Sequence, residues 1–189
     1  MRSIPIAAVA GVEHDRPADR LYESSMALYG SALERLAAAY EADPDLRRDL
    51  LQEIHTALWR SFALFDERCS LRTWIYRVAH NTASSHVARQ MRWRAHQWTS
   101  LEGAAALACS GNTESSVAGR QMLERLMALV RELRPLDRQV ILLYLEGLDG
   151  ASIAEVTGLS AQAVAGKIHR IKAILGRRFH QGENKNGRK

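Results

Sequence analysis

Apolar residues recur every three or four positions through most of the first hundred residues. Between residues 21 and 40 they fall on one helical face. Asp43 followed by Pro44 then predicts a second helix, with an N-cap aspartate and a proline at the first helical position. The apolar positions of that helix recur every four residues, at Leu46, Leu50, Ile54, Leu58 and Phe62. With a third helix from 71 to about 94, the pattern predicts a helical module over 21–98, preceded by a disordered tail at 1–20.

The pattern changes between residues 99 and 119, where small residues dominate and Glu102 and Glu114 carry the only charges. Such a segment buries too little apolar area to offset the entropy of ordering it, so we expect a flexible linker. Helical periodicity resumes over 120–180, and a basic tail follows at 181–189. The predicted fold is therefore all-α, with two small helical domains joined by a flexible linker.

The second domain contains a helix-turn-helix pattern. A short helix at 152–157 precedes Gly158, which suits a tight turn with positive φ, and Ser160 caps the next helix. That helix has a buried-type face spaced by four, three and four residues: Val164, Ile168, Ile171 and Leu175. Its opposite face presents Gln162, Ala165, Gly166, His169 and Arg170, flanked by Lys167 and Lys172. The layout is typical of a helix in the major groove of DNA, although a helical hairpin with a solvated basic face has the same spacing.

Charge favours the DNA-binding interpretation. The 189-residue chain has a formal net charge of +5, and all four lysines lie between 167 and 189. A basic C-terminal end indicates an anionic partner and predicts binding that weakens with salt.

Catalytic and metal-binding patterns are not evident in the sequence. Cys69 and Cys109 lie 40 residues apart, without a further ligand at metal or redox spacing, which favours a reduced cytoplasmic protein. The seven histidines include no metal-binding helical pair, and no nucleophile elbow or glycine-rich phosphate loop occurs. No run reaches the roughly 18 apolar residues of a membrane span. We expect no enzymatic activity, no metal and no cofactor.

Three motifs, taken in order, resemble the extracytoplasmic-function (ECF) group of bacterial RNA polymerase sigma factors. Residues 49–53 read D-L-L-Q-E. Phe65 and a short polar loop precede residues 71–81, which read L-R-T-W-I-Y-R-V-A-H-N, and the helix-turn-helix follows. The resemblance implies that the protein binds core polymerase, through the β′ coiled coil and the β flap, and directs promoter recognition, melting and initiation. It assigns polymerase docking to Asp49, Leu50, Gln52 and Glu53.

The same resemblance implies two DNA contacts. The loop at 65–70 would hold a base flipped from the minus-ten element, with Phe65, Arg77 and Asn81 as contacts. The exposed face of the last helix would read the minus-thirty-five element, where a basic residue is usual in place of Ala165 and a serine or threonine in place of Gly166. Two polar contacts are therefore absent, which shifts readout towards DNA shape. The linker would follow the RNA-exit path, and an anti-sigma factor is an expected partner.

Two other functions share some of these features. A stand-alone regulator, with a helical sensor domain and a C-terminal DNA reader, would bind duplex DNA without polymerase. A helical adaptor with no role at DNA would tolerate loss of His169 and Arg170.

Overall fold

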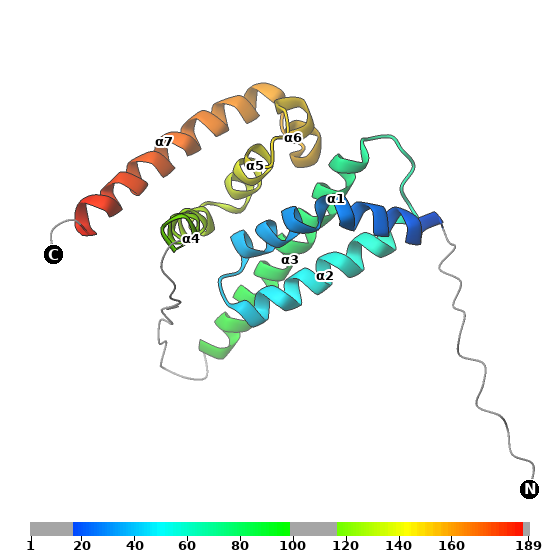
Figure 1. Ribbon diagram of the computed structural model, residues 1–189, viewed down its shortest axis with the longest axis horizontal. Coiled ribbons are helices and arrows are strands. Elements are labelled where there is room, and N and C mark those ends of the chain that lie inside the picture. Colours follow the sequence, from blue (N-terminus) through cyan, green and yellow to red (C-terminus); the bar gives the residue numbers. More distant parts are fainter. Residues whose placement is uncertain (1–16, 99–116, 187–189) are drawn as a thin grey trace, which may run out of the picture.

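The computed structural model describes residues 17–98 and 117–186, which form seven helices and contain no strand (Figure 1). The helices are α1 (Pro17–Tyr40), α2 (Pro44–Phe62), α3 (Leu71–Trp98), α4 (Val117–Arg131), α5 (Pro135–Leu145), α6 (Gly150–Thr157) and α7 (Ala161–Asn186). The all-α prediction is confirmed for these ranges. Most of the predicted linker lies outside the described residues, as do residues 1–16 of the predicted tail.

Helix boundaries differ from the sequence prediction mainly by extension. Helix α1 begins at Pro17 instead of residue 21, α3 runs to Trp98, and α7 continues to Asn186, beyond the predicted limit at 180. Proline is favourable at the first turn of a helix, and residues 94–98 contain neither proline nor glycine to end α3.

The first domain is built on the four-residue repeat of α2. Leu50, Ile54 and Leu58 are fully buried between α1 and α3. Asp43 caps α2 as predicted, because its carboxylate accepts hydrogen bonds from the backbone N–H groups of Asp45 and Leu46 at 2.9 and 3.0 Å. The sequence thus fixes both the start of α2 and the face that it buries.

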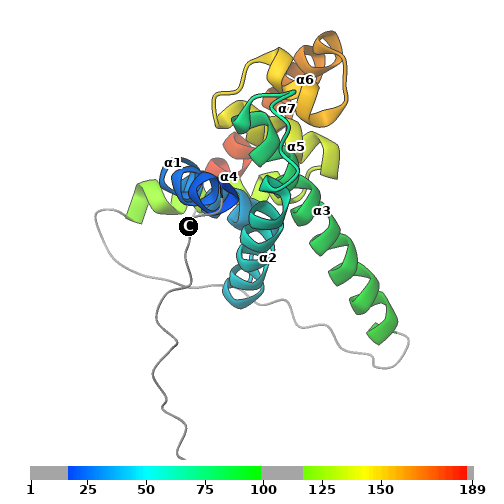
Figure 2. The same ribbon diagram turned by 90° about the vertical axis from the view of Figure 1, so that its right-hand side faces the viewer.

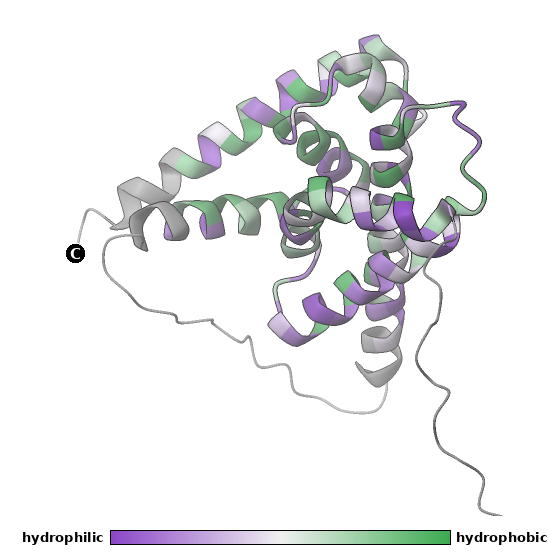
Figure 3. Ribbon diagram, turned by 45° about the vertical axis from the view of Figure 1, so that its right-hand side comes forward, coloured by the Kyte–Doolittle hydropathy of each residue, from purple (hydrophilic) through white to green (hydrophobic). Residues whose placement is uncertain are grey.

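The helix-turn-helix also forms as predicted. Asp149 caps α6 by accepting a hydrogen bond from the Ser152 N–H at 2.7 Å, and Gly158 ends the helix at a φ of 73°. Ser160 caps α7 by accepting a hydrogen bond from the Ala163 N–H at 3.2 Å. In Figure 3 the hydrophobic positions of α4 lie on the side turned towards α7, which packs against it.

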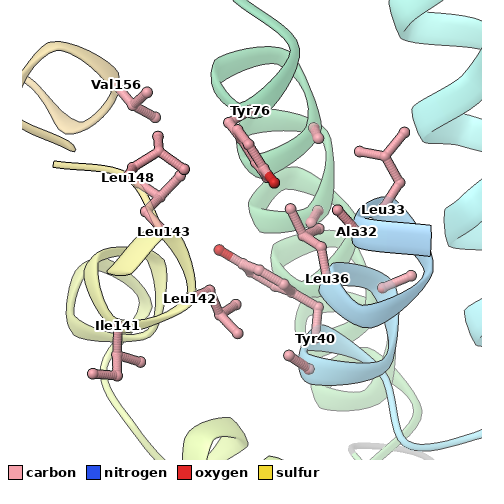
Figure 4. Packing of buried hydrophobic residues seen from close by; sticks show 14 of the residues in the cluster. Ala32, Leu33, Leu36, Tyr40, Tyr76, Ile141, Leu142, Leu143, Leu148 and Val156 are labelled. Carbon is pink, nitrogen blue, oxygen red and sulfur yellow. The ribbon is translucent and has the colours of Figure 1, made fainter. Parts of the chain in front are cut away.

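The two domains pack directly against each other, which the sequence did not predict. Helix α3 contacts α5 and α6, while α1 contacts α4, and Figures 1 and 2 both place α6 beside the N-terminal part of α3. Figure 4 shows Leu142 and Leu143 of α5 facing Tyr40 and Tyr76 of the first domain. The buried apolar residues form one cluster that includes side chains of both domains.

Candidate promoter and polymerase interface

The D-L-L-Q-E motif lies on α2 and divides into exposed and buried positions. Asp49 and Gln52 are exposed, one helical turn apart, whereas Leu50 is fully buried. Leu50 therefore holds α2 in the core and does not offer its side chain to a partner at this surface. Asp49 and Gln52 form the part of the motif that is available for docking.

Glu53, the last residue of the motif, joins α2 to α3. Its carboxylate accepts hydrogen bonds from Arg89 and from His86 Nδ1, the latter at 3.2 Å, and its side chain is 39% exposed. Partial burial raises the pKa of Glu53, but the hydrogen bonds from Arg89 and His86 outweigh this effect and leave the pKa lowered. Glu53 is thus held as a carboxylate between two helices.

Aromatic packing fixes the loop between α2 and α3 at Phe65. The Phe65 ring packs on the Trp74 ring with 5.5 Å between centroids, and Trp74 Nε1 donates to Ser61 Oγ at 3.0 Å. Trp74 is half-buried, so it supports Phe65 from beneath. Beyond Phe65 the loop exposes Asp66, which pairs with Arg68 at 2.8 Å, so the negative charge that would repel phosphates has a local counter-ion.

The two predicted DNA contacts of α3 lie four residues apart but have different surroundings. Asn81 is exposed. The Arg77 guanidinium donates a hydrogen bond at 2.8 Å to the backbone oxygen of Glu155 on α6, and it lies 4.0 Å from the Glu155 carboxylate. In this structure Arg77 therefore contacts the second domain.

The predicted reading face of α7 is open. Gln162, Ala165, Gly166, His169 and Arg170 are all exposed. A Cβ added at Gly166 would meet nothing within 4 Å, so packing inside the protein does not require glycine there. The absence at Gly166 of the serine or threonine that is usual in the family therefore affects only contacts with a binding partner at this face.

Several cations beside that face already have partners. Lys167, only 24% exposed, pairs with Asp137 of α5 at 2.6 Å. Lys172 lies 5.2 Å from the Tyr144 ring centroid, and Arg178 pairs with Glu132 at 2.6 Å. Lys167, one of the predicted phosphate contacts, therefore also joins α7 to α5. The spacing of residues in the sequence does not reveal this second role.

Within residues 17–98 and 117–186, no three histidine, cysteine, aspartate or glutamate side chains gather as metal ligands. None of the helices described there is both long and apolar enough to span a membrane.

Comparison with known proteins identifies both domains. The family model for sigma-70 region 2 matches residues 26–93, and the model for sigma-70 region 4 matches residues 123–175. The RNA polymerase sigma factor CnrH of Cupriavidus metallidurans is 30% identical over 165 residues, which span 82% of this chain and 85% of the relative. The chain belongs to the sigma-70 family, in its ECF group. As a sigma factor, it binds core RNA polymerase and directs it to promoter DNA for transcription initiation.

Two solved structures share the fold. CnrH in complex with the cytosolic domain of CnrY matches with a TM-score of 0.62 at 23% identity, covering 86% of this chain and 89% of that one. The sigma factor RpoE in complex with the anti-sigma factor NepR, from Bartonella quintana, matches with a TM-score of 0.64 at 16% identity, covering 85% and 96%. The sequence resemblance is confirmed, and the stand-alone regulator and the adaptor are set aside.

Proposed function

We propose that the chain acts in the cytoplasm as a non-enzymatic subunit of RNA polymerase. Its first domain, residues 21–98, docks on the β′ coiled coil of the polymerase, and its second domain, residues 120–180, binds the β flap. The observation that carries the docking proposal is the exposure of Asp49 and Gln52 on one face of α2. Buried Leu50 fixes that face, and Glu53 braces it against α3.

The minus-ten element is read by the loop at 65–70 and by α3. An unpaired base stacks on an aromatic or guanidinium plane with a gain that offsets part of the cost of unstacking it. Phe65 is a half-buried ring at the entry to this loop, supported by Trp74. Arg77 and Asn81, one turn apart on α3, supply the neighbouring DNA contacts.

The minus-thirty-five element is read by α7. Gln162, His169 and Arg170 supply the polar groups, and Ala165 and Gly166 leave the backbone open to close approach. Lys167 and Lys172 lie beside this face and contribute positive potential at the phosphates.

An anti-sigma factor is the expected regulatory partner. Both solved relatives are complexes of a sigma factor with a second protein, CnrY in one and the anti-sigma factor NepR in the other. Large apolar side chains that a partner could cover are exposed on the first domain: Leu28, Leu64, Met91 and Trp93.

Run-off transcription with core polymerase and genomic DNA tests the proposed function. The chain is expected to produce start sites that core enzyme alone does not produce. Upstream of them, two shared sequence blocks are expected at a constant spacing. A chain that leaves core enzyme without new start sites, while a known sigma factor activates the same preparation, contradicts the proposal.

Combined His169→Ala and Arg170→Ala substitutions are expected to weaken binding of holoenzyme to a duplex from such a start site by roughly 10- to 100-fold. Loss of the Arg170 charge also lowers the slope of log affinity against log salt by about 0.9 if Arg170 contacts one phosphate. Fluorescence anisotropy at several salt concentrations measures both quantities. Arg60→Ala, which removes an exposed arginine of α2, is the matched control; equal effects of the two variants contradict the assignment of this face.

A further inference from the structure

Helix α3 is packed along its first half and open along its second. Its buried side chains include Ile75, Ala79 and Ala83, and the last one among the described residues is His86, at 3% exposure. From residue 87 to residue 93 every described side chain is partly or fully exposed. In Figure 2 the C-terminal part of α3 extends away from the other helices of its domain. Apolar packing therefore fixes the direction of the first half of α3 more firmly than that of the second.

Glu53 of α2 holds the turns of α3 at which burial ends. One carboxylate oxygen, Oε1, accepts a hydrogen bond from His86 Nδ1 at 3.2 Å, and the other, Oε2, accepts one from Arg89. Hydrogen bonds from cations to a carboxylate are among the stronger ones in proteins. Both carboxylate oxygens are engaged inside the domain, so Glu53 faces α3, whereas Asp49 and Gln52 of the same motif face solvent.

The charge of α3 is entirely positive. Its 28 residues include five arginines and no acidic residue. Arg72 and Arg77, in the first half, donate hydrogen bonds to backbone oxygens of the second domain. In the second half Arg89 pairs with Glu53, whereas Arg92 is exposed and has no acidic partner among the described residues. Arg92 is therefore available to an anionic partner.

Arg92 lies on the same helical face as the proposed DNA contact Asn81. Exposed residues along this face follow a spacing of four, three and four positions: Asn81, Ser85, Ala88 and Arg92. From Asn81 to Arg92 the helix rises about 16 Å, which is the rise of about five base pairs of duplex DNA. DNA bound at Asn81 therefore meets Arg92 only when the second half of α3 keeps its direction.

We propose that Glu53 is a positioning residue for DNA binding. By holding His86 and Arg89, its carboxylate sets the direction of the second half of α3, so that Arg92 contacts a phosphate of the duplex beside the minus-ten element. Polymerase docking by this motif is then left to Asp49 and Gln52. The inference rests on the proposed function of α3 and gives Glu53 a role other than the polymerase contact that the family resemblance implies.

The negative charge of Glu53 allows positioning to be separated from electrostatics. Glu53→Ala removes an acidic group and releases the Arg89 cation, so a change in charge alone would raise the affinity for DNA. Positioning predicts the opposite result, because the second half of α3 loses its hydrogen bonds to α2. Glu53→Ala is expected to weaken binding of assembled holoenzyme to a promoter duplex by roughly 3- to 10-fold.

Arg92→Ala tests the contact that Glu53 positions. This variant is expected to lose a similar roughly 3- to 10-fold in affinity and to lower the slope of log affinity against log salt by about 0.9. In the double variant, Glu53→Ala is expected to add less than about 2-fold to the loss, because the positioned contact is already absent. Glu34→Ala, which removes an exposed glutamate of α1, is the control and is expected to match the wild type.

Two conservative variants of Glu53 divide its charge from its reach. Glu53→Gln keeps an oxygen that accepts hydrogen bonds at the same distance from the backbone, and it is expected to retain most of the DNA affinity. Glu53→Asp keeps the charge but withdraws the carboxylate by one methylene, and it is expected to weaken DNA binding by roughly 2- to 5-fold. Circular dichroism melting verifies that each variant is folded, and Glu53→Asp carries the test if Glu53→Ala is not.

Fluorescence anisotropy with holoenzyme assembled at saturating sigma factor measures the affinity for DNA, and competition for core enzyme measures docking. Glu53→Ala is expected to compete for core within about 2-fold of the wild type, since its side chain is engaged inside the domain. Unchanged or tighter DNA binding by Glu53→Ala overturns the inference, as do additive losses in the double variant or a loss of core affinity as large as that of Asp49→Ala. Failure of the proposed function of α3 is distinct, because Asn81→Ala then leaves the affinity for the promoter unchanged.

Discussion

Replacing Asp49 and Gln52 together with alanine is expected to weaken binding to core polymerase by roughly 100-fold, the effect of losing central contacts of an interface. Both side chains are exposed on one face of α2 and belong to the motif proposed to dock. Their removal leaves polar groups of the partner without hydrogen-bond partners, which costs more than the contacts themselves contribute. Because neither side chain is in the core, the melting temperature is expected to stay within about 2 °C of the wild type.

A matched control is available in the second domain. Gln121 and Glu124 are exposed on α4 and carry the same two functional groups at the same three-residue spacing. Their joint replacement with alanine is expected to leave most of the affinity for core polymerase intact. Affinity is measured by competition for core enzyme with a labelled sigma factor. If the Asp49 and Gln52 variant competes as well as the wild type, α2 is not the docking helix.

Acidification is expected to destabilise the protein through His80. The ring is 1% exposed and lies 3.0 Å from Tyr40 Oη through Nδ1, while its Nε2 has no hydrogen-bond partner among the described residues. Burial lowers the pKa of His80 from 6.5 to about 3. The folded protein therefore holds His80 neutral at pH values where the unfolded chain protonates it. This contribution to stability is fully present above pH 6.5 and is lost as the pH falls from 6.5 towards 3.

The expected magnitude is about 1.4 kcal/mol of unfolding free energy per pH unit below 6.5, or about 2.7 kcal/mol at pH 4.5. Urea unfolding at half-unit steps between pH 7 and 4.5 measures it. Burial also lowers the pKa of His55, which adds a smaller loss in the same direction. Carboxylates with lowered pKa, such as Glu53, lose their contribution only as the pH falls below the range of a free carboxyl.

His80→Asn isolates this histidine because asparagine has no proton to gain in the interval. The variant is expected to start from a lower stability and to lose less of it between pH 6.5 and 4.5. His169→Asn, at an exposed position of α7, is expected to keep the wild-type pH dependence. A His80→Asn variant with an unchanged pH slope shows that protonation of His80 does not govern acid unfolding.

Local signals in the sequence were sufficient for the helices and for the buried faces of α2 and α7. The four-residue repeat predicts that Leu50, Ile54 and Leu58 are buried, and they are. Asp43, Asp149 and Gly158 mark helix ends correctly because caps and left-handed turns depend on a few neighbouring residues. The motifs likewise predicted the family, since each is a contiguous stretch of sequence, at 49–53, 65–81 and 152–175.

Side-chain availability within the motifs needed the structure. Glu53 and Lys167 were predicted to contact partners on the basis of their positions in a pattern. The structure shows that each has an ion-pair partner, at Arg89 and Asp137, which are 36 and 30 residues away. A charged residue at a surface position of a helix gives no sign in its own sequence neighbourhood of which charge faces it across the fold.

The sequence by itself determined the all-α fold, the faces that α2 and α7 bury, and membership of the ECF sigma factors, because these properties follow from local periodicity and contiguous motifs. Only the tertiary structure decided that the two domains lie against each other. The pair of Arg35 with Glu146 spans 111 residues, and that of Arg77 with Glu155 spans 78. Such contacts depend on which apolar faces pack together and on which helix ends, with their unpaired backbone carbonyls, come close to a donor. Periodicity along the chain does not specify this arrangement.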